Sequence, residues 1–304
     1  MAGHIVLFGA TGYTGDLTAR AMVARGLRPV LAARSAQRLE RLAGELGGLE
    51  TRIADVGRPE SVRALVEAGD VLVSTVGPFA RFGEAALHAA IDGRAHYLDS
   101  TGEGPFIRAV FERFGPHAAR AGVGLLTAMG YDWVPGNLAG ALALAEAGER
   151  AVRVDIGYFA PGAGGFAASG GTRASAAGVL LEPSFGWRDG RLATEVPGRH
   201  VRRFALRPGR EAWAVSVGSS EAFALPRVQP RLRDVGVYLG WFGPVSRAMP
   251  AVSTGLGAAT RLPGVRAGLR AGAARAVKGS TGGPDAAARA RSRSLIVAEA
   301  FDAA

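Results

Sequence analysis

The chain has 304 residues with 36 basic and 26 acidic side chains, which give a formal net charge of +10. It contains no cysteine, and this excludes disulfides, thiol nucleophiles and cysteine-ligated metal sites. With 48% hydrophobic and 20% charged residues, the composition is typical of a folded protein that is long enough for two domains.

The basic surplus lies entirely in the second half of the chain. Residues 1–150 hold 15 arginines and 16 acidic residues, whereas residues 151–304 hold 21 basic and 10 acidic residues. This asymmetry favours an anionic partner for the second half, such as a phosphorylated ligand, a nucleic acid or a lipid surface. The alternative is an arginine-rich genome, because Lys278 is the one lysine of the chain.

No export signal precedes the first apolar run, so we expect a cytoplasmic protein. The apolar stretch 235–263 is interrupted by arginine, proline and glycine, which argues against a membrane-spanning helix but leaves peripheral membrane contact open. The arginines at 289–293 lack interleaved aromatic residues and any docking motif, so we do not expect nucleic-acid binding.

Short apolar runs alternate with helical patterns over the first 130 residues. The expected strands are Ile5–Phe8, Pro29–Ala33, Thr51–Ala54, Val71–Thr75, Ala95–Leu98 and Val123–Thr127. The expected helices are Tyr13–Arg25, Gln37–Leu46, one that opens at Pro59, Gly83–Asp92 and Pro105–Ala121. This alternation predicts an α/β fold with a Rossmann-type, doubly wound parallel sheet.

The pattern changes after Pro135. We expect a helix at Asn137–Ala147, a half-exposed strand at Val152–Tyr158, a glycine-rich loop at 161–171 and interrupted helices over 235–280. Three further strands of a small antiparallel sheet are expected at Val201–Leu206, Trp213–Val217 and Ala222–Leu225. We therefore predict a Rossmann domain at 1–135 and a second, α+β domain for substrate binding and dimerisation at 136–304.

A glycine-rich turn joins the first strand to the first helix. Gly9, Gly12 and Gly15 form a G-x-x-G-x-x-G pattern, which allows a tight turn and lets a pyrophosphate approach the helix N-terminus. We expect this turn to bind a dinucleotide with Gly9, Thr11, Gly12, Tyr13, Thr14 and Gly15. A plain strand–helix turn is the alternative.

The end of the second strand indicates which dinucleotide is bound. NAD sites place an acidic residue there to bind the ribose 2′-hydroxyl, but this chain has Arg34 and Ser35 and no carboxylate before Glu40. A guanidinium beside a hydroxyl suits a 2′-phosphate, so we predict NADP(H). An arginine at this position by chance is the alternative.

Two later turns complete the predicted cofactor site. Asp55 and Val56 follow the third strand, where Asp55 either accepts from the adenine amino group or caps the next helix. Val76, Gly77, Pro78 and Phe79 follow the fourth strand, where they either contact the central sugar and nicotinamide or form a plain turn.

The candidate catalytic residues follow the fifth and sixth strands. Asp99 and Glu103 could orient a substrate amine or donate a proton, although Asp99 or Thr101 could instead cap the next helix. Tyr131 is a further candidate proton donor. No tyrosine has a lysine four residues later, so the short-chain reductase mechanism is excluded, and we expect no metal site.

Five motifs in series resemble the saccharopine dehydrogenase-like oxidoreductases, and among them the branch that includes trans-acting enoyl reductases. They are Gly9–Gly15, Ala33–Ser35, Ser74–Phe79, Tyr97–Glu103 and Ala128–Gly136, with a weaker sixth at 169–175. The resemblance implies an NADP-binding Rossmann domain, an α+β substrate domain and a homodimer. Two departures are Asn137, where relatives often have aspartate, and a second domain that ends early.

The motifs and the resemblance lead to two hypotheses. The first is an NADPH-dependent oxidoreductase that transfers hydride to a C=N bond of an amino-acid conjugate or to a C=C bond of an enoyl chain. Its substrate is expected to be a small or thioester-linked anion, since the second half is basic. The second hypothesis is a non-catalytic dinucleotide-binding scaffold or sensor.

Overall fold

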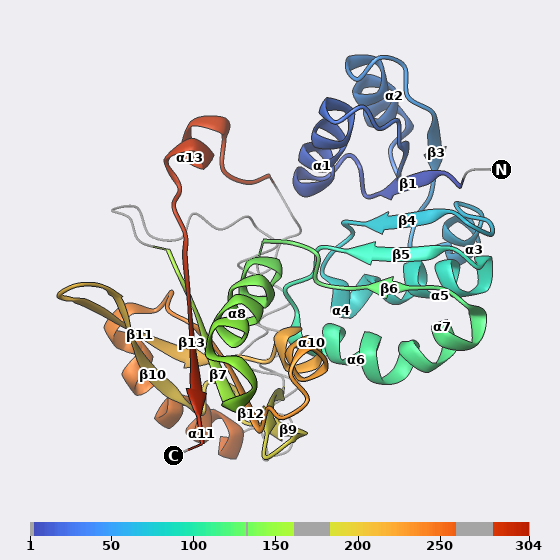
Figure 1. Cartoon of the computed structure of the whole chain (residues 1–304). Coiled ribbons are helices and arrows are strands. Elements are labelled where there is room, and N and C mark those ends of the chain that lie inside the picture. Colours follow the sequence, from blue (N-terminus) through green and yellow to red (C-terminus); the bar gives the residue numbers. More distant parts are fainter. Residues whose placement is uncertain (1–2, 132, 161–182, 260–281, 304) are drawn as a thin grey trace. The chain divides into compact units, whose positions relative to one another are not determined.

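A computed structural model describes residues 3–131, 133–160, 183–259 and 282–303 (Figure 1). The chain divides into two compact units. Residues 1–101 and 106–130 belong to the first unit, and residues 102–105 and 131–279 belong to the second, together with the segment that starts at residue 283. The glycine-rich loop expected at 161–171, the motif at 169–175 and the helices expected over 260–280 lie outside the described residues.

The first unit contains a six-stranded parallel sheet with the order β3-β2-β1-β4-β5-β6. This order is that of the Rossmann fold, so the predicted doubly wound sheet is confirmed. The strands are β1 (Ile5–Phe8), β2 (Val30–Ala33), β3 (Thr51–Ile53), β4 (Val71–Ser74), β5 (His96–Asp99) and β6 (Leu125–Leu126).

Helices cover both faces of this sheet (Figure 1). They are α1 (Tyr13–Ala24), α2 (Ala36–Glu45), α3 (Pro59–Arg63), α4 (Phe79–Phe82), α5 (Glu84–Gly93), α6 (Gly104–Ala109) and α7 (Gly115–Ala121), with a π-helical turn at Val110–Phe114. Successive residues of β1 enter different cores, because side chains alternate across a strand. Val6 and Phe8 belong to one buried cluster and Leu7 belongs to the other.

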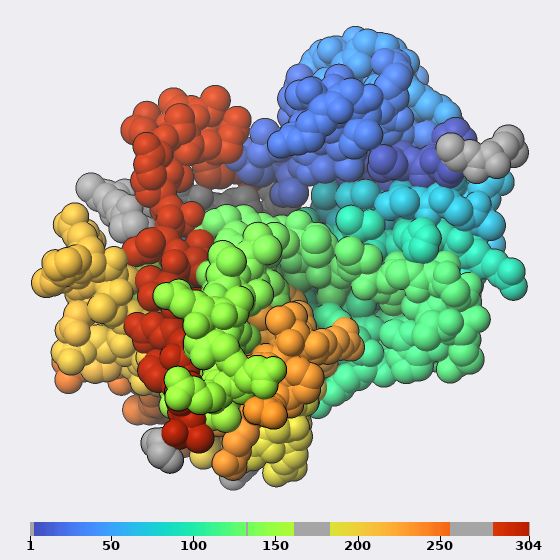
Figure 2. All heavy atoms as spheres, in the orientation of Figure 1, coloured from blue at the N-terminus to red at the C-terminus, as the bar shows by residue number. Residues whose placement is uncertain are grey.

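The second unit contains a mixed sheet with the order β10-β11-β12-β7-β13, and the β8–β9 hairpin is attached to β12. Its strands are β7 (Ala151–Phe159), β8 (Ser184–Arg188), β9 (Arg191–Glu195), β10 (Val201–Arg207), β11 (Arg210–Ser216), β12 (Asp234–Leu239) and β13 (Leu295–Asp302). Its helices are α8 (Val134–Ala147), α10 (Glu221–Val228), α11 (Met249–Ala259) and α13 (Ala286–Arg291), with 3₁₀ turns at Gly148–Arg150 and Gly243–Ala248. Helix α8 packs on β7 and β13, and Figure 2 shows its outer side next to β13.

Three expectations for the second unit are wrong. Ala222–Leu225 lies in helix α10 rather than in a strand, because Ala222 and Leu225 are three residues apart and are buried on one helix face. Residues 235–239 form strand β12 rather than a helix, since their apolar side chains pair between β7 and β11. Strand β7 is buried rather than half-exposed, because it is central in the sheet and α8 covers it.

The second sheet is also not purely antiparallel, since β12 and β7 run parallel. Strand β12 was not predicted from the sequence, because it lies in a stretch rich in Gly and Pro. Among the described residues, no helix is both long and apolar enough to cross a membrane.

An ion-pair network ties the carboxyl-terminal strand to the middle of the second sheet. Asp155 of β7 is 1% exposed and forms ion pairs with Arg153 at 2.6 Å and with Arg202 of β10. Arg202 also pairs with Glu299 of β13, and its guanidinium lies 4.9 Å from the centre of the Phe301 ring. Burial lowers the pKa of Arg202, and the carboxylate of Glu299 opposes this shift.

We expect Asp155→Ala to lower the free energy of unfolding by about 2 kcal/mol, because it removes the buried carboxylate that Arg153 and Arg202 share and leaves Arg202 paired with Glu299 alone. The matched control is Glu211→Ala, which removes the exposed pair with Arg203 and is expected to cost less than about 1 kcal/mol. Urea denaturation of both variants measures the two costs. Equal costs would contradict the structural role of Asp155.

Candidate functional site

The glycine turn has the close contacts that a phosphate-binding loop requires. Gly9 has a φ of +91°, and a Cβ on it would lie 2.7 Å from Oγ1 of Thr75. A Cβ on Gly15 would overlap the carbonyl oxygen of Gly9. Both positions therefore need glycine, Gly9 for its backbone conformation and Gly15 for the packing of α1 on β1.

Gly12 differs because it faces outward. It is exposed, and a Cβ on it would meet only the Gly9 carbonyl oxygen, at 3.3 Å. Gly12 is the N-cap of α1, whose first-turn amides have no intrahelical acceptor, and a bare backbone there lets an anion approach them. Thr11, Tyr13 and Thr14 lie in the same turn, so the loop fits the pyrophosphate of a dinucleotide.

One arginine follows β2 directly, and a second lies in the first turn of α2. Arg34 is exposed, and among the described residues no carboxylate forms an ion pair with it. The Ser35 hydroxyl accepts the backbone N–H of Arg38 at 3.4 Å and caps α2, so it is engaged within the protein. Arg38 donates from its guanidinium to the carbonyl of Thr11, which brings a second cation to the glycine turn.

Sequence reasoning missed Arg38. A signal was present, since Arg38 stands four residues after Arg34, which is one helical turn. Its contact with Thr11 depends on how α2 packs beside the loop, and the sequence does not specify that packing.

The turn after β3 is held by local hydrogen bonds. Asp55 Oδ1 accepts the N–H of Gly57 at 2.9 Å, and the Asp55 N–H donates to the Ser61 hydroxyl at 3.0 Å. The N-cap of α3 is Arg58, so Asp55 does not cap that helix. Val56 packs against the core. The adenine contact of Asp55 and Val56 stays a prediction.

The turn after β4 joins the core to the sheet edge. Val76 packs against the first-unit core, and Phe79 is 6% exposed with its ring 5.6 Å from that of Phe106. The Gly77–Pro78 peptide bond is cis. The side chains of Val76 and Phe79 thus pack against the core of the first unit. We therefore expect a cofactor contact of this turn to come from its backbone.

Asp99 ends β5 as a buried, fully hydrogen-bonded carboxyl. Its Oδ1 accepts the N–H groups of Thr101 and Ala128, both at 2.9 Å, and its Oδ2 accepts the Thr127 hydroxyl at 2.8 Å. Burial raises its pKa, and these three donors oppose the rise. Asp99 also holds Ala128 at a φ of +62°, a conformation that costs energy for alanine.

The other two candidate catalytic residues belong to the second unit. Glu103 is half-buried, and Tyr131 is 47% exposed. Asp99 of the first unit, in contrast, is 2% exposed. Catalytic roles for Asp99, Glu103 and Tyr131 stay predictions.

A second buried carboxyl, Glu221, was not singled out from the sequence. It is the first residue of α10, is fully buried, and its Oε1 accepts the Tyr158 hydroxyl at 2.6 Å. Burial raises its pKa to about 7, against hydrogen bonds that lower it. Gly136 makes room for this pair, since a Cβ there would overlap the Tyr158 hydroxyl. In the sequence Glu221 is an ordinary acidic residue before an expected strand, and its burial in the structure is what makes it unusual.

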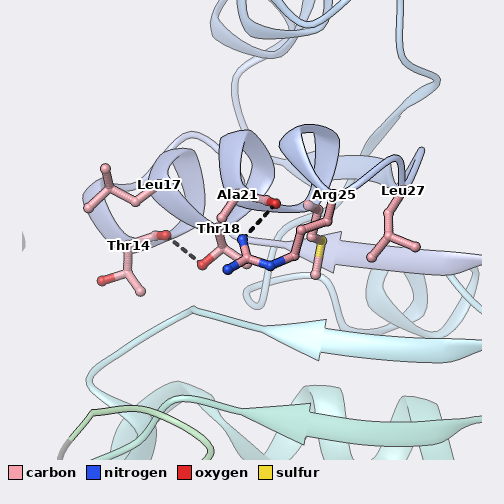
Figure 3. Close-up of a pocket in the computed structure, with 7 residues that line it drawn as sticks. Thr14, Leu17, Thr18, Ala21, Arg25 and Leu27 are labelled. Carbon is pink, nitrogen blue, oxygen red and sulfur yellow. Dashed lines mark hydrogen bonds between the residues drawn. The ribbon is translucent and has the colours of Figure 1, made fainter.

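A shallow pocket lies along α1 (Figure 3). It is lined by Thr14, Leu17, Thr18, Ala21, Met22, Arg25 and Leu27. The guanidinium of Arg25 donates to the Ala21 carbonyl at 3.1 Å, and Thr18 donates to the Thr14 carbonyl at 2.8 Å. The lining is apolar apart from these groups, so the pocket does not suit a phosphate.

The sheet order, the glycine turn and the arginines at the end of β2 together define a dinucleotide-binding domain of the Rossmann class. Residues 5–124 match the family model of the saccharopine dehydrogenase NADP binding domain. This match confirms the predicted resemblance to that family over residues 5–124, and it confirms NADP(H) as the cofactor of the first unit.

Curated relatives share this part of the chain. A trans-acting enoyl reductase of Mycobacterium ulcerans (strain Agy99) is 34% identical over 141 residues, which cover 44% of this chain and 34% of the relative. The trans-acting enoyl reductase of Mycobacterium bovis (strain BCG / Pasteur 1173P2) is 34% identical over 140 residues, with the same coverage. The matched region thus spans about a third of the length of these relatives.

A solved structure is similar over more of the chain. The apo saccharopine dehydrogenase (L-Glu forming) of Saccharomyces cerevisiae aligns with a TM-score of 0.53 at 16% identity. The alignment covers 78% of this chain and 55% of the yeast enzyme. At this identity the likeness shows the fold, including part of the second unit.

We expect Arg34→Asp to weaken NADPH binding by about a hundredfold and to reverse the preference for NADPH over NADH, because a carboxylate repels a 2′-phosphate and accepts from a 2′-hydroxyl. Arg38→Ala is expected to weaken NADPH more than NADH. Arg41→Ala, an exposed arginine on the same helix, is the control. Fluorescence titration measures the dissociation constants, and unchanged selectivity in Arg34→Asp would refute the role of Arg34.

Glu221 is expected to make stability depend on pH. Its pKa is 4.5 in its ordinary state and about 7 when folded, so the folded protein binds this proton more tightly than the unfolded chain. Its contribution is therefore complete below about pH 4.5 and decreases by roughly 3 kcal/mol as the pH rises to about 7. The difference between the unfolding free energies of wild type and Glu221→Gln, followed against pH, isolates this effect, and a constant difference would contradict it.

Proposed function

We propose that this chain is an NADPH-dependent reductase that delivers hydride to the C=C bond of an enoyl thioester. The observation that carries the proposal is the glycine turn with Arg34 and Arg38 nearby, where no carboxylate of the described residues forms an ion pair with Arg34. It explains a preference for a phosphorylated dinucleotide as reductant. NADPH supplies the hydride when it is bound.

The enoyl substrate is supported by the relatives. The chain is 34% identical to trans-acting enoyl reductases over its NADP-binding half, whereas the saccharopine dehydrogenase likeness, at 16% identity, concerns the fold. A C=N bond of an amino-acid conjugate is therefore the second candidate substrate. The basic second half favours an anionic group, as a coenzyme A or carrier-protein thioester carries.

Reduction of an enoyl thioester also needs a proton at the carbon next to the carbonyl, once hydride has reached the other carbon. We assign this proton to the hydroxyl of Tyr131, because the residue is half-exposed and follows the strand β6 in the sequence. Asp99 positions the loop after β6 through Thr127 and Ala128. Glu103 is assigned to substrate orientation, since it is half-buried next to the start of α6.

Stopped-flow oxidation of NADPH with 2-enoyl thioesters of coenzyme A and with imines of amino acids tests the proposal. We expect turnover with the enoyl thioester and faster turnover with NADPH than with NADH. Turnover with imines alone would support the second substrate, and NADPH binding without any turnover would support a scaffold or sensor.

Tyr131→Phe is expected to lower the turnover number by about a hundredfold or more and to leave NADPH affinity unchanged, because it removes one hydroxyl. Steady-state kinetics and a separate binding titration check the two parts. Full turnover in this variant would remove Tyr131 as the proton donor. The predicted homodimer is tested by sedimentation of the same preparation.

A further inference from the structure

The first turn of α8 is held by a closed ring of hydrogen bonds. The Trp133 carbonyl accepts from the backbone N–H and the side-chain Nδ2 of Asn137, each at 3.0 Å. Asn137 Nδ2 also donates to the Ser220 hydroxyl at 2.9 Å, and Ser220 lies 3.4 Å from Oε2 of Glu221. The ring closes through Tyr158, whose hydroxyl oxygen lies 2.6 Å from Oε1 of Glu221 and 3.4 Å from the Trp133 carbonyl.

The Tyr158 hydroxyl cannot serve both of its neighbours at once, because it has one proton to donate. When Glu221 is neutral, its O–H donates to the Tyr158 oxygen, and Tyr158 is free to donate to the Trp133 carbonyl. When Glu221 is ionised, the carboxylate takes the Tyr158 proton, since a hydrogen bond to a charged acceptor is the stronger one. The Trp133 carbonyl then loses this donor.

The turn has few other side-chain anchors. Trp133 is 2% exposed, and its Nε1 has no hydrogen-bond partner among the described residues. The same holds for Oδ1 of Asn137. The turn is therefore held by the ring and by the buried indole of Trp133, which packs edge-on against Tyr158, and Gly136 keeps the space that the ring occupies.

Among the described residues, no second charged group is found among those that shift the pKa of Glu221. The groups that act on the Glu221 carboxyl besides burial are its own backbone N–H and the hydroxyls of Tyr158, Ser219 and Ser220. Strands β12 and β8 also pack against α10, and their charged side chains are Asp234 and Arg188. Arg188 is paired with Glu195. Burial raises the pKa of Glu221 to about 7, so both protonation states are populated near neutral pH.

We propose that Glu221 is a positioning residue whose proton lets Tyr158 donate to the Trp133 carbonyl and so tightens the first turn of α8, and whose ionisation withdraws this third donor and loosens the turn. Tyr131 stands two residues before Trp133 in the sequence. The proposal goes beyond the reductase function and does not depend on it, since the ring needs neither cofactor nor substrate.

Two variants fix the ring in opposite states. Glu221→Gln offers an amide N–H to Tyr158 at every pH and therefore imitates the neutral acid. Tyr158→Phe removes the hydroxyl, so Trp133 lacks that donor at every pH. Hydrogen exchange of the full chain, measured by mass spectrometry and corrected for the intrinsic pH dependence of exchange, reports on the amide of Asn137 and its neighbours.

In the wild type we expect protection of this turn to fall about tenfold between about pH 6 and about pH 8. Glu221→Gln should stay protected at both pH values, and Tyr158→Phe should be unprotected at both. Helix α1 of the first unit is the internal reference and should not respond. A pH response that survives in Glu221→Gln, or a wild type without any response, would overturn the proposal.

A measurement on the wild type alone covers the case in which a variant does not fold. Infrared spectra of the native protein should show the carbonyl band of a buried, protonated carboxyl that disappears with a midpoint near neutral pH. The loss of the band and the loss of α8 protection should share one midpoint. Separate midpoints, or a carboxyl that is ionised throughout, would refute the coupling.

Discussion

The contact between Gly15 and the carbonyl of Gly9 determines the architecture on which cofactor binding depends. It lets α1 begin directly at the end of β1, so that the helix N-terminus and the ends of the neighbouring strands share one edge of the sheet. Arg34 follows β2 at this edge, and Arg38 reaches it from α2. The loops after β4 and β5 also begin at this edge. A side chain at position 15 would separate helix from strand and remove the common edge.

Each unit also contains one deeply buried carboxyl, and the two are stabilised differently. Asp99 receives two backbone N–H groups and a hydroxyl, which fix the loop after β6. Glu221 receives one close hydroxyl, and its other neighbours are longer contacts or its own backbone. Because Asp99 has more strong hydrogen-bond donors, it holds the loop after β6 in one arrangement. The hydrogen bonds of Glu221, in contrast, are proposed to change when it gains or loses its proton.

The sequence predicted the first unit well because its strands are short apolar runs separated by helical patterns, and the strands β1 and β2 inside the sheet are buried along almost their whole length. It predicted the second unit poorly. Ala222–Leu225 is too short for the period of a strand to be told from that of a helix, and β12 lies in a stretch rich in Gly and Pro. Glu221 and Arg38 were missed for a related reason, since burial and the packing of α2 arise from tertiary contacts that no local pattern contains.

Strand β13 has a consequence for how the chain folds. It pairs along its whole length with β7, so residues 295–302 must find residues 151–159 across more than a hundred positions of intervening chain. The strands of the first sheet, in contrast, follow one another within residues 5–126. Closing the longer loop costs more entropy and slows folding. During synthesis, the cofactor domain can therefore fold while β7 is still unpaired on one edge, and the pairing of β7 with β13 forms only after β13 has left the ribosome.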